Sequence, residues 1–275
     1  LDIRGSEAGF PNAATGVRCE NGSCVRVAGN VITGRGGTQA TGVWLQQTGA
    51  LVDRNTVRGG CSPTAVGVYS EDAWARLQNN RVFGFTQQDC GSATTTPGQS
   101  TGLRALTSTG LRELDVHSNF FDGGGQASTG ATCTSRAVAL GATSMPPTVP
   151  NGLFRNNIFR AGTCATRYGF EELVASADPR ELANNDFDPA TTPTALYFDE
   201  ATTAVTTAAG IDALAGTTAT ATRSVDPQFT SYPTDLHLLA GSMCIDAGTT
   251  TGAPAYDMDG AARTGTPPDI GPDER

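Results

Sequence analysis

One short pattern returns six times along this chain: an apolar residue, two further positions, an asparagine, one more position and a second apolar residue. The asparagines that carry it are Asn30, Asn55, Asn80, Asn119, Asn157 and Asn185. The first three lie 25 residues apart, and a fixed period in this range is typical of solenoid proteins. The chain therefore builds its fold from a structural repeat.

A second marker, a glycine followed by an apolar residue, runs in step with the asparagines. Its copies are Gly16-Val17, Gly42-Val43, Gly67-Val68 and Gly102-Leu103. Each repeat holds at least two short strands, because its segments are too short and too rich in glycine and threonine for helices. Coils of a parallel β-helix lie about 4.8 Å apart, so buried asparagines of successive coils can stack and exchange amide hydrogen bonds. The pattern predicts an all-β solenoid, a parallel β-helix with an asparagine ladder.

The repeat also predicts how the chain is organised. We expect residues 1–199 to form the coils, and residues 200–275 to form a last coil and a capping tail of the same domain. The later asparagines are 39, 38 and 28 residues apart, so the middle coils carry insertions. One insertion lies at 87–101, and the other is divided between 123–134 and 144–150. Insertions in solenoids often build one binding face.

The composition excludes several kinds of partner. The chain has a net charge of −9, and all 18 of its basic residues are arginine. An acidic surface argues against nucleic acid and against docking on anionic membranes. The sequence has no apolar run of about 18 residues, the length that a membrane span needs. We therefore expect no nucleic acid partner and no membrane insertion within this chain.

Four of the seven cysteines follow a repeat asparagine closely and so belong to the same corner of successive coils. We predict that they pair as Cys61–Cys90 and Cys133–Cys164, with a third bridge at Cys19–Cys24, which leaves Cys244 over. The alternative is a set of free buried thiols in a cytosolic protein. The bridges would instead require an oxidising, extracytoplasmic compartment, so the protein would be secreted or on the cell surface.

The segments after the last repeat carry a resemblance to a known family. They are Val225-Asp226-Pro227-Gln228-Phe229, Asp235-Leu236-His237-Leu238, Gly241-Ser242-Met243-Cys244-Ile245-Asp246-Ala247-Gly248, Asp257-Met258-Asp259-Gly260 and Asp269-Ile270-Gly271-Pro272-Asp273-Glu274. This tail, over about residues 224–274, resembles the C-terminal region of secreted bacterial proteins of the pectate-lyase-like superfamily, which often end in a surface-anchoring segment. The resemblance implies a right-handed, single-stranded parallel β-helix. It implies no single activity, because the superfamily holds lyases, hydrolases, epimerases and non-enzymatic adhesins.

Alignment of the repeats places polar residues in outward columns. The position after the first apolar residue holds Gln78, His117 and Arg155, and the position before it holds Arg76 and Asp115. A histidine beside a carboxylate and two arginines could abstract a proton from a uronic acid while the guanidinium groups neutralise its carboxylate. We therefore treat His117, Asp115, Arg76 and Arg155 as candidate catalytic residues. The outer faces of solenoids are polar even without a function, so the pattern leaves both interpretations open.

Absent residues weigh against catalysis. Lyases of this superfamily commonly use lysine or arginine as the base with aspartates that hold calcium, and the related hydrolases use aspartate pairs and a His-Gly element. The chain has no lysine, no aspartate cluster within its coils, no Asp-Asp pair and no His-Gly. Glu171-Glu172 and Asp199-Glu200 are adjacent in sequence, which on a strand points them to opposite faces. They are poor partners for a two-carboxylate mechanism.

A third column, two positions after each marker glycine, holds Arg18, Trp44, Tyr69 and Arg104. The inward residues flank it, so Trp44 and Tyr69 should face outward on neighbouring coils. They would form a flat platform for the face of a sugar, with Arg104 beside it for polar contacts. The alternative is a satellite cluster of two rings beneath a loop.

The tail contains one motif typical of metal binding. Asp257-x-Asp259-Gly260 resembles the opening of a calcium loop but lacks the bidentate glutamate at the required distance. No cofactor is required by the sequence, and Ca²⁺ is possible at these two aspartates. The alternative is that the acids cap turns in a tail that folds back on the last coil.

These patterns favour three functions in a definite order. The first is a secreted or cell-surface, non-catalytic β-helix that recognises a polysaccharide or cell-surface glycan. The second is a polysaccharide lyase or related enzyme acting on acidic sugars. The third is a structural subunit whose uncapped first coil stacks into a homo-oligomer or an extracellular assembly.

Overall fold

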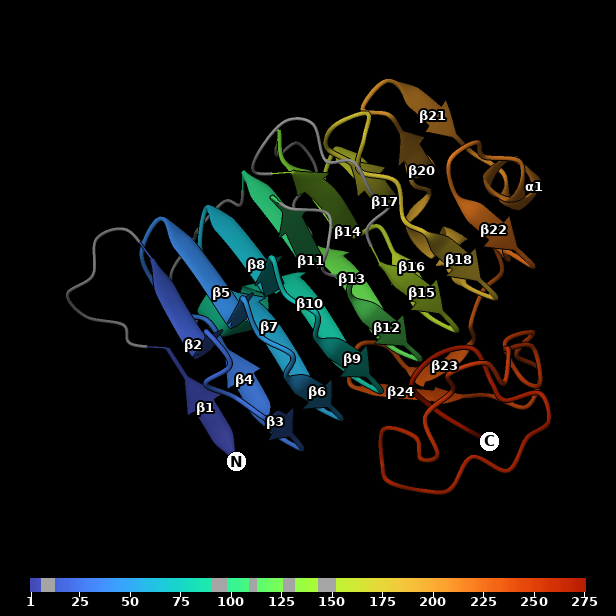
Figure 1. Ribbon diagram of the computed structural model, residues 1–275, viewed down its shortest axis with the longest axis horizontal. Helices are drawn as coiled ribbons and strands as arrows, with labels where there is room; N and C mark the ends of the chain where they lie inside the picture. Colours follow the sequence, from blue (N-terminus) through green and yellow to red (C-terminus); the bar gives the residue numbers. More distant parts are fainter. Residues whose placement is uncertain (6–12, 91–97, 109–112, 126–131, 143–151) are drawn as a thin grey trace.

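A computed structural model of the chain describes residues 1–5, 13–90, 98–108, 113–125, 132–142 and 152–275. Most of the described residues lie in strands or in turns between strands, and the protein is all-β (Figure 1). No helix in these ranges is long and apolar enough to span a bilayer. Most of the insertions expected in the middle coils (91–97, 126–131 and 144–150) lie outside the described residues.

Three long sheets make up the body of the protein. Sheet A contains β1 (Asp2–Arg4), β4 (Val31–Thr33), β7 (Thr56–Gly60), β10 (Arg81–Phe85), β13 (Phe120–Gly124), β16 (Ile158–Arg160) and β19 (Asp186–Asp188). Sheet B contains β2 (Ala14–Glu20), β5 (Gln39–Gln46), β8 (Thr64–Glu71), β11 (Gln99–Thr107), β14 (Thr134–Ala142), β17 (Thr166–Glu172), β20 (Ala195–Asp199) and β21 (Thr203–Val205). Sheet C contains β3 (Arg26–Ala28), β6 (Leu51–Asp53), β9 (Arg76–Gln78), β12 (Asp115–His117), β15 (Leu153–Arg155), β18 (Glu181–Ala183) and β22 (Thr218–Thr220).

The chain visits the three sheets in turn, from A to B to C and back to A, as far as β20. Each strand pairs in parallel with the strand of the same sheet that precedes it by one round. The register matches the sequence repeat, since Val43 pairs with Val68, and Val68 with Leu103. These long parallel sheets are consistent with a β-helix.

Small apolar side chains fill the space between the sheets. Val43, Val68 and Leu103 are fully buried, as are Val57 and Val82 on sheet A. Larger rings enter the main core from Phe121 onward, and Phe170 stacks on Tyr197 with ring centroids 5.1 Å apart. The repeat therefore returns the same apolar positions to the core in every round, which explains its spacing.

The repeat asparagines lie between sheets C and A and bond to one another. The Nδ2 atom of each donates to the Oδ1 atom of the next over 2.9 to 3.2 Å, from Asn30 through to Asn185. The same Oδ1 atoms also accept the backbone N–H of the preceding asparagine. All but Asn30 are fully buried. Each buried amide is thus satisfied by the neighbouring rounds, as buried polar groups must be.

Three disulfides join the cysteines in the predicted pairs: Cys61–Cys90, Cys133–Cys164 and Cys19–Cys24. The first two each link successive rounds of the chain, while the third closes a six-residue turn. Cys244 is free and buried, and burial raises the pKa of its thiol. The alternative of unpaired thiols at the coil corners is wrong.

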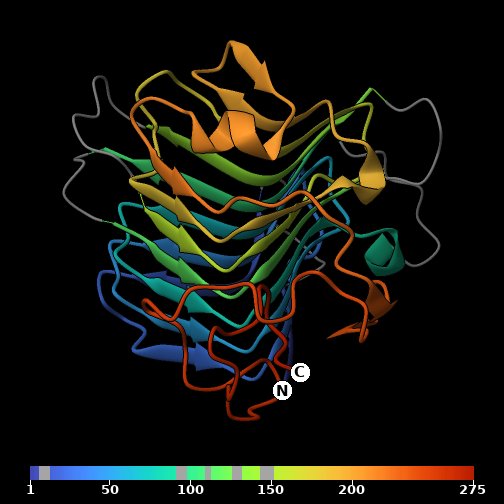
Figure 2. The ribbon, with the colours of Figure 1, turned by 90° about the vertical axis from the view of Figure 1, so that its right-hand side faces the viewer.

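The C-terminal end of the sheets is covered by residues that follow β20. β21 pairs with β20 in an antiparallel manner, and β22 adds to the end of sheet C. Between them lies α1 (Ala208–Asp212), whose Ile211 is fully buried against the main core. Figure 2 shows these elements together over one end of the molecule. They occupy the place where a capping tail was expected.

The tail beyond residue 222 runs back along the side of the molecule and does not stop at the last coil (Figure 1). Its carbonyl groups accept hydrogen bonds from the Nδ2 atoms of Asn79, Asn156 and Asn184, at the corner after sheet C. These three residues have φ angles between +51° and +55°, a conformation that asparagine tolerates better than most residues. The tail was expected to fold back on the last coil alone, but it also contacts earlier coils.

A short hairpin of the tail covers part of sheet A. It consists of β23 (Phe229–Ser231) and β24 (Asp235–Leu238). Leu236 and Leu238 form a second apolar core with Phe120 and Ile158 of the sheet. Tyr232 donates a hydrogen bond to the buried Asp122. The hairpin thus turns the outer face of the later sheet A strands into an interior.

Candidate functional site

The outer face of sheet B carries the predicted aromatic column. Arg18, Trp44, Tyr69 and Arg104 pair in one row across β2, β5, β8 and β11. Each belongs to a strand whose adjacent apolar residue points into the core, so the period of two directs these side chains outward. The sequence column is therefore a real row on one surface.

Trp44 and Tyr69 do not form the flat platform that the sequence predicts. Their ring centroids lie 4.5 Å apart with the planes inclined at 44°, and both side chains are half-buried. They line a cavity of about 220 Å³ together with Arg104, Thr41 and Thr64. A tilted aromatic pair at the side of a shallow cavity replaces the flat surface.

Two donors at this cavity are unused among the described residues. The Nε1 atom of Trp44 and the Nε atom of Arg104 are buried and have no hydrogen-bond partner. The guanidinium of Arg18 lies 4.9 Å from the centroid of the Trp44 ring, a distance typical of a cation–π contact. Burial raises the pKa of Tyr69, so its hydroxyl remains a donor near neutral pH. Unsatisfied buried donors are costly in a folded protein, and a ligand can satisfy them.

The row continues into later strands in a way that the sequence analysis missed. Arg104 pairs with Ala139, and the row then reaches Glu171 and Phe198. Arg136 forms an ion pair with Glu171 on the same face. Burial, followed by the charge of Arg104, lowers the pKa of Arg136 to about 10. The signal was present in the sequence, because Gly169-Phe170 is a further copy of the glycine marker and places Glu171 in the column.

The predicted catalytic patch does assemble on sheet C. Asp115 pairs in register with Arg76, and His117 pairs with Arg155. The Nε2 atom of His117 lies 2.5 Å from Oδ1 of Asp115, and Arg155 also binds Glu181. Although partial burial opposes it, the hydrogen bond with His117 and the charges of the two arginines lower the pKa of Asp115. The carboxylate is therefore held ionised beside the imidazole.

The expectation that this patch is an open outer surface is wrong for His117. The side chain is fully buried, because the tail crosses directly above it. A Cβ atom added at Gly252 would lie 2.5 Å from the imidazole, and the Gly252 carbonyl accepts a hydrogen bond from Arg76. The patch therefore fastens the tail to sheet C. No substrate could reach the imidazole without displacement of this segment.

The two predicted calcium ligands, Asp257 and Asp259, form different contacts in the tail. Asp257 is buried, and its Oδ1 accepts the N–H groups of Asp259 and Ala261. Asp259 points instead toward His237, whose Nε2 lies 2.7 Å from its Oδ2. Asp257 thus caps a turn, as the alternative to calcium binding predicted. The pair is a poor match to Ca²⁺, which takes six to eight oxygen ligands.

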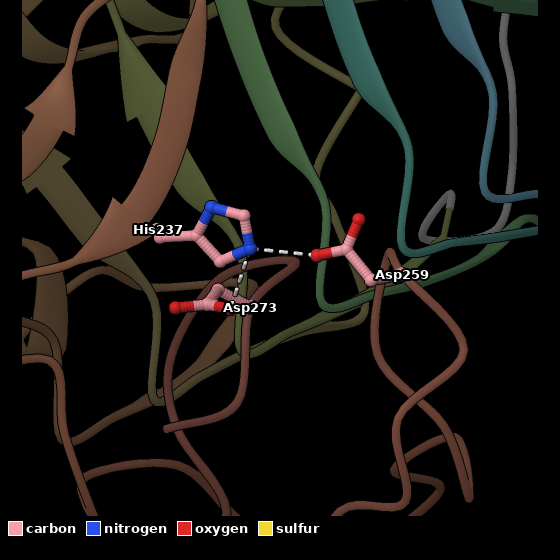
Figure 3. Close-up of side chains that lie close together, drawn as sticks. All are labelled: His237, Asp259 and Asp273. Carbon is pink, nitrogen blue, oxygen red and sulfur yellow. Dashed lines mark hydrogen bonds and ion pairs between the residues drawn. The ribbon is translucent and has the colours of Figure 1, made fainter.

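A different group of potential ligands gathers around His237, as Figure 3 shows. Its Nε2 faces Asp259 and lies 3.9 Å from Oδ1 of Asp273, while Nδ1 contacts Asp235 at 2.5 Å. The hydrogen bond to Asp235, followed by that to Asp259, raises the pKa of His237. The imidazole and the two carboxylates of Asp259 and Asp273 have ligand atoms within 4.8 Å of one another, so together they could bind a metal ion. Equally, the two carboxylates could stabilise the protonated form of His237. Proton and metal would compete for the same nitrogen.

Comparisons with known proteins were negative: no family model, no curated protein and no solved structure matches the chain. The fold and its surfaces therefore define a class, an all-β protein of long parallel sheets with three disulfides. Membership of the pectate-lyase-like superfamily remains a proposal that rests on the sequence motifs and these sheets.

Proposed function

We propose that this protein is a secreted or cell-surface, non-catalytic β-helix that binds a glycan on the outer face of sheet B. Its fold would be the right-handed, single-stranded parallel β-helix of the pectate-lyase-like superfamily, with the asparagines as its ladder. The observation that carries the proposal is the cavity lined by Trp44, Tyr69 and Arg104. The three disulfides favour an extracytoplasmic location, because such bonds persist in oxidising compartments.

The chemistry of the cavity suits a sugar. Aromatic rings offer an apolar face to the C–H groups of a sugar ring, and their hydroxyl or N–H groups remain free for its polar edge. Trp44 Nε1 and Arg104 Nε supply donors without partners among the described residues. Thr41 and Thr64 in the lining add hydroxyl groups that both donate and accept. This combination matches a ligand rich in hydroxyl groups.

Replacing both Trp44 and Tyr69 with alanine should abolish binding to the uncharged glycans on an array of plant, bacterial and animal glycans. Removal of central aromatic anchors commonly costs about 2 kcal/mol or more, which is roughly thirtyfold in affinity. Trp74→Ala is the matched control, because Trp74 is exposed and does not line the cavity. Unchanged binding of these uncharged glycans by the double variant, with its melting temperature close to that of the wild type, would refute the proposal.

The enzymatic alternative makes a distinct prediction. Because the tail covers His117, purified protein should produce no unsaturated product from uronic-acid polysaccharides, with or without calcium. The ultraviolet absorbance of that product during incubation measures β-elimination directly. A rise in absorbance that His117→Ala abolishes would establish the lyase hypothesis and would require the tail to move.

A further inference from the structure

A groove on the outer face of sheet A lies apart from the proposed glycan site. Its floor is formed by β1, β4, β7 and β10, before the sheet passes beneath the hairpin. Two cavities of about 270 and 210 Å³ lie along it and share Val31, Arg58 and Gln88 in their lining. One side is formed by the short helix η1 (Gln87–Cys90) and one end by Pro233 and Thr234 of the hairpin. Figure 2 shows η1 and the hairpin on the same side of the molecule.

Two arginines project into the groove without a partner. Arg58 and Arg81 lie on adjacent strands, and the neighbouring Val57 and Val82 point into the core. Within the described part of the chain, neither guanidinium forms a hydrogen bond or an ion pair within 4.0 Å. By contrast, Arg160 on the same sheet binds Asp188 at 2.6 Å. The groove thus presents guanidinium groups whose donors are free.

The acidic residues in and near the groove form their hydrogen bonds and ion pairs with other residues than these two arginines. Asp2 forms an ion pair with Arg4 at 2.7 Å, and Asp89 accepts a hydrogen bond from Thr86. The pKa of Asp235 is lowered chiefly by its hydrogen bonds with His237, and the charge of Arg81 is the smallest of the causes. A local excess of positive charge therefore exists on a protein whose net charge is −9. A guanidinium has five donors and no acceptor, so the matching ligand group is an oxyanion.

The remaining lining discriminates between kinds of anionic ligand. Thr56, Gln88 and Thr234 carry groups that both donate and accept hydrogen bonds, as sugar hydroxyls do. Phe83 and Pro233 add apolar surface beside them. An extended peptide would instead pair its main chain with an open strand edge. The strands that carry Arg58 and Arg81, β7 and β10, are paired on both sides, and the open edge at this end of the sheet is β1. The lining favours a saccharide.

We propose that this groove binds an anionic saccharide, whose carboxylate or sulfate group is held by Arg58 and Arg81. The site does not depend on the glycan face of sheet B, because it shares no residue with the cavity around Trp44 and Tyr69. The protein would then contact an acidic polysaccharide on two separate faces. Binding at the groove should weaken with added salt, because partly exposed charges are screened.

Isothermal titration calorimetry tests the proposal with defined probes. They are a sulfated oligosaccharide without carboxylates, a uronic-acid oligosaccharide, a neutral oligosaccharide of similar length and an oligoglutamate peptide. Arg58→Gln and Arg81→Gln should each weaken binding of at least one anionic saccharide about tenfold, since each removes a charge-assisted contact. Arg180→Gln is the matched control, because it removes the same charge from an exposed side chain outside the groove. Arg58→Lys should restore only part of the affinity, since lysine cannot bind bidentately.

Each outcome decides a part of the proposal. Preference for the sulfated or for the uronic-acid probe identifies the anionic group and supports the site. Binding of neither probe, equal losses in Arg180→Gln, or equal affinity of the Trp44 and Tyr69 double variant for the neutral probe would overturn it. Oligoglutamate bound as tightly as the saccharides would overturn the ligand class. The double variant of Trp44 and Tyr69 should keep its affinity, and a loss there would assign the probe to sheet B instead. Melting temperatures establish that every variant is folded.

Discussion

Replacing Asn119 with alanine should lower the free energy of unfolding by about 3 to 5 kcal/mol, because several buried polar groups lose their partner together. Its Oδ1 accepts from the backbone N–H and the Nδ2 of Asn80, both over 2.9 Å. Its Nδ2 donates to the carbonyls of Leu77 and His117 and to Asn157. Alanine can form none of these hydrogen bonds. Because the position is fully buried, bulk water does not reach the groups that lose their partner. Urea unfolding monitored by circular dichroism measures the loss.

Asn30→Ala is the matched control, since the same residue type is changed at the first member of the series. Asn30 is half-buried and bonds to Ala28 and Asn55, so water can replace part of what is lost. We expect a cost of about 1 kcal/mol there. Equal costs at the two positions would mean that the asparagines act singly, and that burial in the middle of the series adds nothing.

The sequence predicted the repeating part of the protein because every round repeats the same physical demands. The period of 25 residues fixes which apolar residue is buried, and the asparagine column fixes the register between rounds. Once the register is known, the offsets of Cys61 and Cys90 from their asparagines bring them to the same corner, where they are bonded. In a repeat protein, the position of a residue within its repeat therefore also predicts which residues of the neighbouring rounds it contacts.

The tail lacks this redundancy, and its path could not be predicted in the same way. It crosses the body where Asn79, Asn156 and Asn184 each present an amide from a left-handed corner. The available signal was the Asn-Asn dipeptide, which ends at a repeat asparagine three times. In each pair the second residue bonds to its neighbours in the series, while the first binds the tail. A single occurrence would not distinguish a tail contact from an ordinary turn.

For a related reason, the sequence predicted which residues lie on the candidate functional surfaces better than it predicted how exposed they are. The column of Trp44 and Tyr69 follows directly from the repeat, but the tilt of the rings depends on packing that no pattern encodes. The column of His117 follows from the repeat as well, yet its burial depends on where Gly252 lies, 135 residues further along the chain. The groove around Arg58 needs the hairpin and η1 as its boundaries. Outward position is thus predictable from a repeat, and exposure is not.

Asp186 should make the protein less stable as the pH rises from about 4 to about 8. Its carboxyl is fully buried, its Oδ1 accepts the N–H of Val225, and its Oδ2 has no partner among the described residues. Burial raises its pKa from 3.8 to about 8. The folded state therefore keeps a proton that the unfolded chain has already released, so a higher pH favours unfolding until the folded carboxyl also ionises. One pKa unit is worth about 1.4 kcal/mol, so the shift from 3.8 to about 8 sets an upper limit of about 6 kcal/mol on the loss of stability.

Asp186→Asn should remove this dependence, because the amide keeps an acceptor for Val225 and carries no charge at any pH. The variant should melt roughly 10 °C above the wild type near pH 8 and close to it near pH 4. Asp212→Asn is the control, since it removes one charge from an exposed side chain. Glu172, whose pKa burial raises to about 7, leaves a smaller slope of the same sign that Glu172→Gln should abolish. A melting curve of Asp186→Asn that falls with pH as steeply as that of the wild type would show that Asp186 is ionised in the folded protein, and that a cation or water compensates its charge.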